Sequence, residues 1–365
     1  MVVALRVTFD NVKMPLDSDG RPVKTGMLDV LDNTERDGHY YVYMDDFGCS
    51  RQVSCCDSNT SLPWPENKCY TCCPAMKHAA YGLNHTTIVY RVSPDFKHWV
   101  NLGVVFNASA AGMNRMTFRP HVVHNPSTSQ YMLWLGVYDL TDPRYLIATS
   151  SSPAGPFVIS TPHLDFVCGG GNHSDPKIPE TVGDFDLLVS GPDLFVVVTH
   201  YTFFCIEKLR RGDWAAGTGE TRTVEAMDPK IPGGIPGDEA PVFFARGGRF
   251  YLMYGSGCCD CKGGSNSWVY SAAQPLGPYT RQGDVGTDPH TGAPVTRAQA
   301  SAVFRLAPQD ETVSTYMWVG NNFVPGDGGE GTCTNHALLY WWPIHFFMNG
   351  SVSQFQWLPQ VHVNI

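Results

Sequence analysis

The sequence predicts an all-β protein, a five-bladed β-propeller with a cysteine-rich loop inserted in its first blade. Turn-forming residues are frequent, since the 365 residues include 36 glycines and 27 prolines. Aromatic-rich strand segments recur along the chain, and no stretch has the composition and periodicity of a long helix. Hydrophobic residues make up 43% of the chain, enough for a large core, and we expect one domain over residues 1–365.

Each predicted blade is marked by a small or polar turn that precedes an aromatic-rich strand. The five segments are Gly38–Met44, Ser129–Leu135, Asp193–Thr199, Gly248–Tyr254 and Ser314–Gly320. Their aromatic markers, Tyr41, Tyr131, Phe195, Tyr251 and Tyr316, are separated by 90, 64, 56 and 65 residues. Without the insertion at 49–84 the first interval is 54 residues. Repeats of this size without helical periodicity indicate four-stranded propeller blades.

A second recurring motif is a Pro-containing bend that ends on an aromatic residue. It occurs at Ser93–Trp99, Ser151–Phe157 and Ala273–Tyr279, each time after a short strand. Proline and glycine set the bend, and we expect the aromatic ring to cover the core of the blade. The ring of blades would close by pairing Val2–Phe9 with the last strand, at Val361–Ile365, which hides both strand edges.

The composition excludes several classes of protein. Aromatic residues at 12% exclude a disordered chain, and no apolar run approaches the roughly 18 residues of a membrane span. The net charge is −9, without a stripe of Lys and Arg, so nucleic acids and membrane insertion are not expected. Neutral ligands such as carbohydrates suit this surface, although an acidic surface can also serve solubility alone.

The twelve cysteines predict disulfide bonds. Six lie between residues 49 and 73, three more lie at 258–261, and the full set is Cys49, Cys55, Cys56, Cys69, Cys72, Cys73, Cys168, Cys205, Cys258, Cys259, Cys261 and Cys333. The spacing of Cys69 and Cys72 also fits a zinc site. We favour disulfides because the chain carries five glycosylation sequons, at Asn59, Asn84, Asn107, Asn172 and Asn349. The connectivity does not follow from the sequence.

These features favour a secreted or extracellular protein. The first residues lack the long apolar core of a signal peptide and resemble a strand, so we expect any signal to be absent from this sequence. In the insertion 49–84, we expect three disulfides that are largely internal, with adjacent cysteines reaching Cys258 or Cys259 as the alternative. We place this loop on a propeller face near the mouth of the site, where it would shape a glycan subsite or a protein contact.

Five segments carry a resemblance to a known family: Arg119–Trp134, Ala148–Phe157, Gly183–Val189, Glu239–Pro241 with Tyr251, and Gln299–Ser301. From about residue 26 to 358, apart from the cysteine insertion, the sequence resembles glycoside hydrolase family 43, and within it the branch of exo-β-1,3-galactanases. The resemblance implies a five-bladed propeller with a central active site that cleaves galactan or arabinogalactan-type glycans. Inverting cleavage needs an acid for the leaving oxygen and a group that activates water on the opposite face.

The resemblance implies three catalytic residues. Glu239, next to an apolar Ala-Pro turn, would be the proton donor, and Asp184 would orient it and line the sugar subsite. Asp186, two residues on, is the alternative to Asp184. Gln299 replaces a carboxylate base, and an amide more easily positions water than removes its proton. Without the resemblance, Glu239 would equally be a surface turn residue and Gln299 a polar residue that begins a strand.

Two departures from the family pattern count against catalysis. Phe118 replaces a glutamate ahead of Arg119-Pro120. The resemblance places both Phe118 and Arg119 among the residues that contact the sugar. The His- and Gly-rich turn common in relatives is Val23–Leu28 here, and Asp29 is a candidate replacement base. Loss of one cooperating carboxylate typically lowers the rate by orders of magnitude. The alternative function is therefore a catalytically inactive propeller that binds glycans or belongs to an extracellular protein assembly.

Other candidate ligands are weaker. Tyr145, Trp268, Trp318 and Trp342 are candidates for stacking on sugars, although strand aromatics more often lie in the core. The histidines at 121, 124, 200 and 336 fit core or rim positions better than ligand positions. No cofactor is required, and a calcium ion in the central channel is the one alternative that the resemblance offers.

Overall fold

The computed structural model describes residues 6–23, 26–46, 86–113, 116–138, 142–169, 182–200, 203–225, 238–256, 264–306, 315–322 and 338–364. The insertion 49–84, ten of the twelve cysteines, His336 and the sequons at 59, 84 and 172 lie outside these ranges. The predictions on them therefore stay predictions. Within the described ranges, no helix combines the length and apolarity needed to cross a bilayer.

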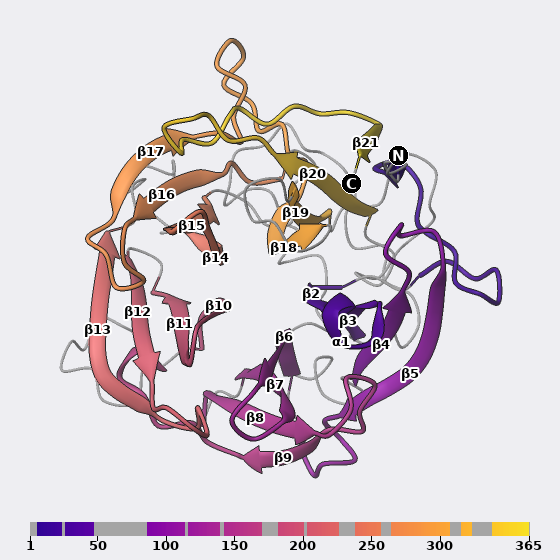
Figure 1. Ribbon diagram of the computed structural model, residues 1–365, viewed down its shortest axis with the longest axis vertical. Coiled ribbons are helices and arrows are strands. Elements are labelled where there is room, and N and C mark those ends of the chain that lie inside the picture. The colour runs from indigo at the N-terminus through magenta and orange to yellow at the C-terminus, as the bar shows by residue number, and fades with distance from the viewer. Residues whose placement is uncertain are drawn as a thin grey trace, which may run out of the picture.

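Five antiparallel sheets surround a central axis as the blades of a propeller (Figure 1). In chain order the first three consist of β2 (Leu28–Asp32), β3 (Tyr40–Asp46), β4 (Thr86–Val92) and β5 (Trp99–Asn107); β6 (Met116–Asn125), β7 (Gln130–Tyr138), β8 (Arg144–Ser150) and β9 (Val158–Thr161); and β10 (Phe185–Ser190), β11 (Asp193–Thr199), β12 (Phe203–Leu209) and β13 (Gly217–Glu225). The last two consist of β14 (Glu239–Arg246), β15 (Arg249–Gly255), β16 (Trp268–Ala272) and β17 (Thr280–Asp284); and β18 (Gln299–Leu306), β19 (Thr315–Asn322) and β20 (Leu338–Ile344). The predicted five-bladed propeller is confirmed.

The fifth blade differs from the prediction of four strands per blade. Its sheet contains three described strands, and a separate two-stranded sheet of β1 (Arg6–Asp10) and β21 (Gln360–Asn364) packs beside β20. One short helix, α1 (Thr34–Asp37), and one 3₁₀ turn, η3 (Val167–Gly169), complete the regular elements of the described residues.

The aromatic repeat arises from equivalent positions in the five blades. Each marker lies at the second or third residue of the second strand of its blade, and all are at most 6% exposed: Tyr41, Tyr131, Phe195, Tyr251 and Tyr316. Second strands such as β11 are buried on both faces, because blades cover them on either side. The outermost strand β13 is mostly exposed and correspondingly polar. The repeat spacing therefore reports blade packing.

The core lies between neighbouring blades. One apolar cluster joins blades one and two around Tyr43 and Leu133, and another joins blades two and three around Trp134 and Phe185. The first strands β2, β6, β10, β14 and β18 face the axis, and each contacts the first strand of the next blade. Residues at the starting ends of these strands are therefore brought together.

The two chain ends close the propeller as predicted. β1 pairs antiparallel with β21, from Arg6 opposite Asn364 to Asp10 opposite Gln360. Asn11, which is 1% exposed, then extends this contact to β20. Its Oδ1 accepts the N–H of Trp341 at 2.7 Å, and its Nδ2 donates to the carbonyl oxygens of Trp341 at 3.2 Å and Leu358 at 2.9 Å. One amide side chain thus replaces a missing strand neighbour.

A disulfide ties the segment between blades two and three to blade three. Cys168 in η3 bonds to Cys205 in β12 across 37 residues, and both belong to the predicted disulfide set. The buried carboxylate of Glu207 accepts the backbone N–H of Cys168 at 2.9 Å and of Gly219 at 3.0 Å. The turn between the blades is thus held by a covalent bond and by a satisfied buried charge.

We predict that Asn11→Ala lowers the free energy of unfolding by about 2 to 3 kcal/mol, because it leaves buried backbone groups of β20 without partners. Urea unfolding followed by tryptophan fluorescence measures the loss. Asn101→Ala is the control: among the described residues this exposed side chain accepts only the nearby N–H of Gly103, and its removal should cost less than about 1 kcal/mol. Equal losses in the two variants would contradict the closing role of Asn11.

Candidate active site

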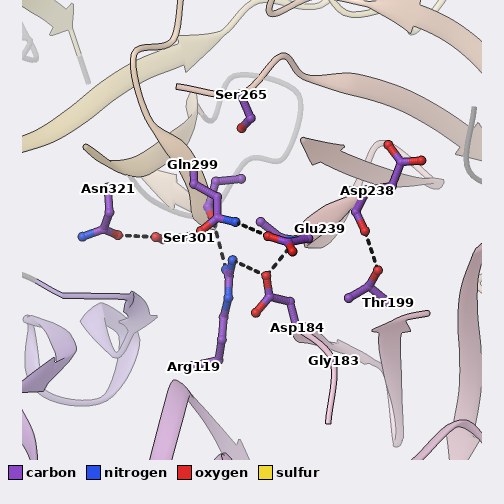
Figure 2. Close-up of polar contacts among 12 residues, drawn as sticks. Arg119, Gly183, Asp184, Thr199, Asp238, Glu239, Ser265, Gln299, Ser301 and Asn321 are labelled. Atoms are coloured by element: carbon purple, nitrogen blue, oxygen red, sulfur yellow. Dashed lines mark hydrogen bonds and ion pairs between the residues drawn. The ribbon is translucent and has the colours of Figure 1, made fainter. Parts of the chain in front are cut away.

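Arg119 lies at the centre of the polar cluster at the propeller axis (Figure 2). A bulge in β6 between Phe118 and His121 gives Arg119 a φ of 54°, in the left-handed region, and turns its side chain across the axis. The side chain is 1% exposed. Its Nη1 donates to the carbonyl of Ala300 and its Nη2 to Oδ2 of Asp184, both at 2.9 Å. Its backbone N–H donates to the Asp45 carboxylate, also at 2.9 Å.

Asp184 continues this network to the fourth blade. Its Oδ2 also accepts the N–H of Ala240 at 3.0 Å. Ala240 has a φ of 55° in a bulge at the start of β14 and is followed by Pro241, which repeats the local geometry of Phe118-Arg119-Pro120. Arg119 of blade two thus contacts blades one, three and five, and Asp184 of blade three contacts blade four.

Glu239 and Gln299 meet beside this ion pair. Gln299 Nε2 donates to Oε2 of Glu239 at 3.0 Å. Gln299 is 4% exposed, whereas Glu239 is half-buried. A half-buried carboxyl group is accessible to a ligand and partly withdrawn from water, the setting that a general acid needs. The three predicted catalytic residues therefore converge at the starting ends of three neighbouring first strands.

Second strands fix the backbone around these residues. In β11 the N–H of Thr199 donates to the carbonyl of Asp184 at 2.9 Å, and its Oγ1 donates to the carbonyl of Asp238 at 2.6 Å. A Cβ added at Gly183 would lie 2.1 Å from the Thr199 carbonyl oxygen, so only glycine permits this approach. Thr199 thereby sets the positions of both predicted carboxylates.

A second polar pair holds the strand that carries Gln299. Ser301 Oγ donates to Oδ1 of Asn321 in β19, and Asn321 Nδ2 donates to the carbonyl of Gly26 in the first blade. No role for Asn321, Thr199 or Asp45 follows from the sequence. The sequence pointed to these residues only indirectly. Ser301, which bonds Asn321, belongs to the Gln-Ala-Ser segment, and Thr199 and Asn321 lie at the ends of strands that carry the aromatic markers.

Phe118 lies in the packed core and not among the polar groups. It is 5% exposed in the cluster between blades two and three. It pairs with Gly136 across the sheet, and a Cβ added at Gly136 would lie 2.6 Å from its Cζ. The ring therefore occupies the space that the glycine leaves, while the equivalent position in the fourth blade is Glu239.

The predicted stacking aromatics are mostly buried. Tyr145 is 1% exposed and donates to the Gly183 carbonyl at 2.8 Å, and Trp318 is 0% exposed. Trp342 is 4% exposed in the same core cluster as Trp318. Trp268 is half-buried, with the Arg281 guanidinium 4.2 Å from its ring centroid. Because covered rings cannot stack on a sugar, we assign packing to Tyr145, Trp318 and Trp342.

A second buried ionic cluster links three of the first strands, β2, β6 and β10. His121 Nδ1 lies 3.2 Å from Oδ1 of Asp186 and 3.6 Å from Oδ1 of Asp29. Asp29 Oδ2 accepts the N–H of Val122 at 2.7 Å, and Asp186 Oδ2 accepts the N–H of Phe243 at 2.6 Å. Each carboxylate thus ties its blade to the next. The sequence alternatives, Asp186 in place of Asp184 and Asp29 as a base, are used structurally here.

Burial shifts the protonation of this cluster. Burial, supported by the nearby Asp29, raises the pKa of Asp186 to about 6 despite the opposing charge of His121. Burial alone would lower the pKa of His121, but Asp186 and Asp29 outweigh it and raise that pKa. His124 differs: burial and the Arg36 charge lower its pKa. His200 is buried, with Nε2 3.1 Å from the Cys168 carbonyl oxygen.

The described residues do not fit a calcium ion in the central channel. Calcium takes roughly six to eight oxygen ligands. In the ranges that the structure covers, no three His, Cys, Asp or Glu side chains are grouped so as to hold a metal. The buried Nε2 of His121 lacks a hydrogen-bond partner there, but a single imidazole nitrogen is not the ligand set that calcium prefers. We derive no step through a metal ion.

Comparison with known proteins establishes the fold. No protein-family model and no curated protein matches the sequence. The structure is similar to an exo-β-1,3-galactanase from Clostridium thermocellum, with a TM-score of 0.69 and 15% identity over 95% of this chain and 64% of that chain. A glycoside hydrolase family 43 β-1,3-galactosidase solved with galactodeoxynojirimycin has a TM-score of 0.66 and 15% identity over 96% and 99%.

A third similar structure is an exo-β-1,3-galactanase from Phanerochaete chrysosporium solved with β-1,3-galactotriose, with a TM-score of 0.63 and 13% identity over 96% of this chain and 67% of that chain. The chain spans slightly less than two thirds of the Clostridium enzyme. At these identities the likeness concerns the fold. The chain has the five-bladed propeller of the family 43 galactanases and galactosidases, as the sequence resemblance predicted.

The His121 cluster predicts that stability falls as the pH rises. The pKa of Asp186 and that of His121 are both raised in the fold. Each group therefore stabilises fully below its unfolded pKa, about 3.9 for Asp and about 6.5 for His, and loses this contribution as the pH passes its folded pKa. Urea midpoints measured between pH 5 and pH 8 should fall for the native sequence and change less for Asp186→Asn.

Asp193→Asn is the matched control for this pH dependence. The hydrogen bond from Arg211 lowers the pKa of Asp193, so its contribution is lost only at pH below its unfolded value of about 3.9. The change between pH 5 and pH 8 should therefore remain. An unaltered slope in Asp186→Asn would show that the cluster does not titrate in this range.

Proposed function

We propose that the protein is a glycoside hydrolase that cleaves galactan or arabinogalactan-type glycans outside the cell by an inverting acid/base mechanism. The observation that carries the proposal is the convergence of Glu239, Asp184 and Gln299 around the buried Arg119 at the propeller axis. The fold shared with β-1,3-galactanases and β-1,3-galactosidases supports the substrate class. Acceptance of a carbohydrate also agrees with the low charge content of the chain.

Glu239 is the proton donor in this mechanism. Its half-buried carboxyl group protonates the glycosidic oxygen as the bond to the anomeric carbon breaks. Gln299 donates its amide N–H to Glu239 Oε2, so it lies beside the acid, and we assign it the role of orienting the carboxyl group in place of holding the water. Water attacks the anomeric carbon from the face opposite Glu239 and loses its proton to solvent, because a neutral amide is a poor base.

Asp184 and Arg119 have separate roles. Asp184 Oδ2 is occupied by Arg119 and by the N–H of Ala240. Its side chain is 12% exposed, which leaves a limited edge for a sugar hydroxyl. Arg119, at 1% exposed, has little surface for the substrate. We therefore assign Arg119 a positioning role through Asp184, in place of the direct sugar contact considered from the sequence.

The second candidate is a glycan-binding propeller without catalysis, alone or within an extracellular assembly. The specific observation in its favour is Phe118, whose buried ring stands where the family has a carboxylate. A site with one carboxylate fewer still binds neutral sugars through Asp184, Glu239 and Gln299. Hydrolysis of β-galactan or arabinan oligosaccharides separates the two functions.

We predict that Glu239→Gln lowers kcat on β-1,3-galactooligosaccharides by about 10²- to 10⁴-fold while KM changes by less than about threefold, because an amide keeps the shape of the side chain but cannot donate a proton as an acid. Product release is measured by chromatography, and NMR of the first-formed sugar reports inversion. Glu220→Gln, at an exposed position in β13, is the control and should retain full activity.

The outcomes divide the two candidate functions. Cleavage by the native chain that is lost in Glu239→Gln supports the hydrolase. Sugar binding by calorimetry without cleavage by either protein supports the binding propeller. Cleavage that survives unchanged in Glu239→Gln rejects Glu239 as the acid.

For Arg119→Lys we predict a loss of about 2 to 4 kcal/mol in the free energy of unfolding and a kcat at least about tenfold lower, with a smaller change in KM. A single ammonium group cannot reproduce the two directed hydrogen bonds to Asp184 and Ala300. Arg6→Lys, at an exposed residue of β1, is the control. A variant that loses stability but keeps kcat would show that Arg119 is structural only.

A further inference from the structure

The hairpin turn after β20 holds the sequon Asn349-Gly350-Ser351 in a defined geometry. The N–H of Gly350 donates to the carbonyl of Phe347 at 2.9 Å, and the N–H of Phe347 donates to the carbonyl of Ser351 at 2.8 Å. Gly350 has a φ of +83°. These features define a three-residue hairpin loop that ends in a left-handed residue, a position that favours glycine.

Blade four anchors this turn. Tyr251 in β15 donates its hydroxyl to the carbonyl of Gly350 at 2.9 Å. Gln282 in β17 accepts the N–H of Val352 at 3.0 Å through its Oε1. The turn is therefore fixed against the neighbouring blade on both sides of Ser351.

The Asn349 side chain is exposed and oriented by its own sequon. Its Oδ1 accepts the N–H of Ser351 at 2.9 Å and the Ser351 hydroxyl at 2.7 Å. Its Nδ2 makes no hydrogen bond to any residue that the structure describes. With the oxygen engaged, the nitrogen is the atom of this amide that remains for reaction.

The surface beside Asn349 suits an attached sugar. Asn349 and Ser351 line a hollow of about 490 Å³ with the polar side chains of Arg249, Gln274 and Gln282. On the same turn Phe347 is 59% exposed and Met348 is fully exposed. A sugar has hydroxyl groups for such polar side chains and an apolar face for an aromatic ring.

We propose that Asn349 carries an N-linked glycan whose first sugars occupy this hollow and cover Phe347. The co-reactant is an oligosaccharide linked to a lipid through diphosphate. Asn349 Nδ2 attacks the anomeric carbon, a C–N bond forms, the bond from that carbon to the diphosphate oxygen breaks, and the amide releases one proton to a base. No electrons are exchanged with an oxidant or reductant.

This site lies at the opposite end of the blades from Glu239. β14 begins at Glu239 and ends at Arg246, which pairs with Arg249 at the rim of the hollow. Eight residues of strand separate the two ends by roughly 23 Å. The glycan therefore leaves the candidate active site open, and the proposal does not depend on the proposed function.

Asn107 provides an internal contrast. It is the other sequon among the described residues, but it is half-buried and its Oδ1 accepts the N–H of Ala110 at 2.9 Å. We expect Asn349 to be modified to a higher occupancy than Asn107.

The test expresses the full chain behind a secretion signal in eukaryotic cells and analyses protein pooled from medium and cells. Treatment with peptide N-glycosidase in H₂¹⁸O converts each glycosylated Asn to ¹⁸O-labelled Asp, which peptide mass spectrometry locates. We expect the label at Asn349 in most molecules, its loss in Ser351→Ala, and labels at other sequons unchanged in that variant. Unlabelled Asn349 in the native chain, whether other sequons are labelled or not, would overturn the proposal.

Contact with Phe347 is tested by a double-mutant cycle in Tm. Ser351→Ala removes the glycan together with one hydroxyl, so its effect on Tm is measured in the native chain and again in the Phe347→Ser chain. The hydroxyl is lost in both, so its effect cancels in the difference between the two measurements. We expect the native chain to lose about 1 to 2 °C more than the Phe347→Ser chain. Equal losses in both backgrounds would reject the contact between the glycan and Phe347.

Discussion

The buried ion pair of Arg119 and Asp184 fixes how the blades meet at the propeller axis. A guanidinium that is 1% exposed is tolerated only when a carboxylate and further acceptors replace its hydration. Asp184 supplies the charge and Ala300 a carbonyl, and the same Asp184 oxygen receives the N–H of Ala240. These contacts therefore also set the positions of four blades, two to five, around the axis.

Backbone bulges make this convergence possible. Straight first strands would point alternate side chains toward neighbouring blades and would leave the axis to backbone groups. At Arg119 and Ala240 a left-handed residue followed by proline reorients the start of the strand. Left-handed conformations at non-glycine residues are unfavourable and persist where surrounding contacts enforce them. Here the enforcing contacts are the hydrogen bonds made by Asp45 and Asp184.

The fold was predictable because its signal is repeated five times, whereas much of the site was not. Tyr41 and its counterparts recur because each blade buries the same position, so their spacing is visible without a structure. Asn321 and Thr199 act through single hydrogen bonds at strand ends, and short polar residues there leave no periodic pattern. Tyr145 and Trp318 look equally suited to stacking and to packing, because only the neighbouring blade decides whether a ring is covered. The contact of the terminal strand pair with β20 runs through Asn11, one amide that no periodicity marks.

Phe118 and Glu239 show how equivalent positions of a propeller acquire different uses. Both precede a left-handed residue and a proline at the start of a first strand. In blade two the facing residue across the sheet is Gly136, which leaves a space that an aromatic ring fills. In blade four Glu239 lies opposite Gly255 but is held by Gln299 of the next blade. An apolar ring thus joins the core at one position and a carboxylate reaches the axis at the other. A polar group at residue 118 would need both a partner and a replacement for the packing over Gly136, so the composition of the site and the packing of blade two are coupled.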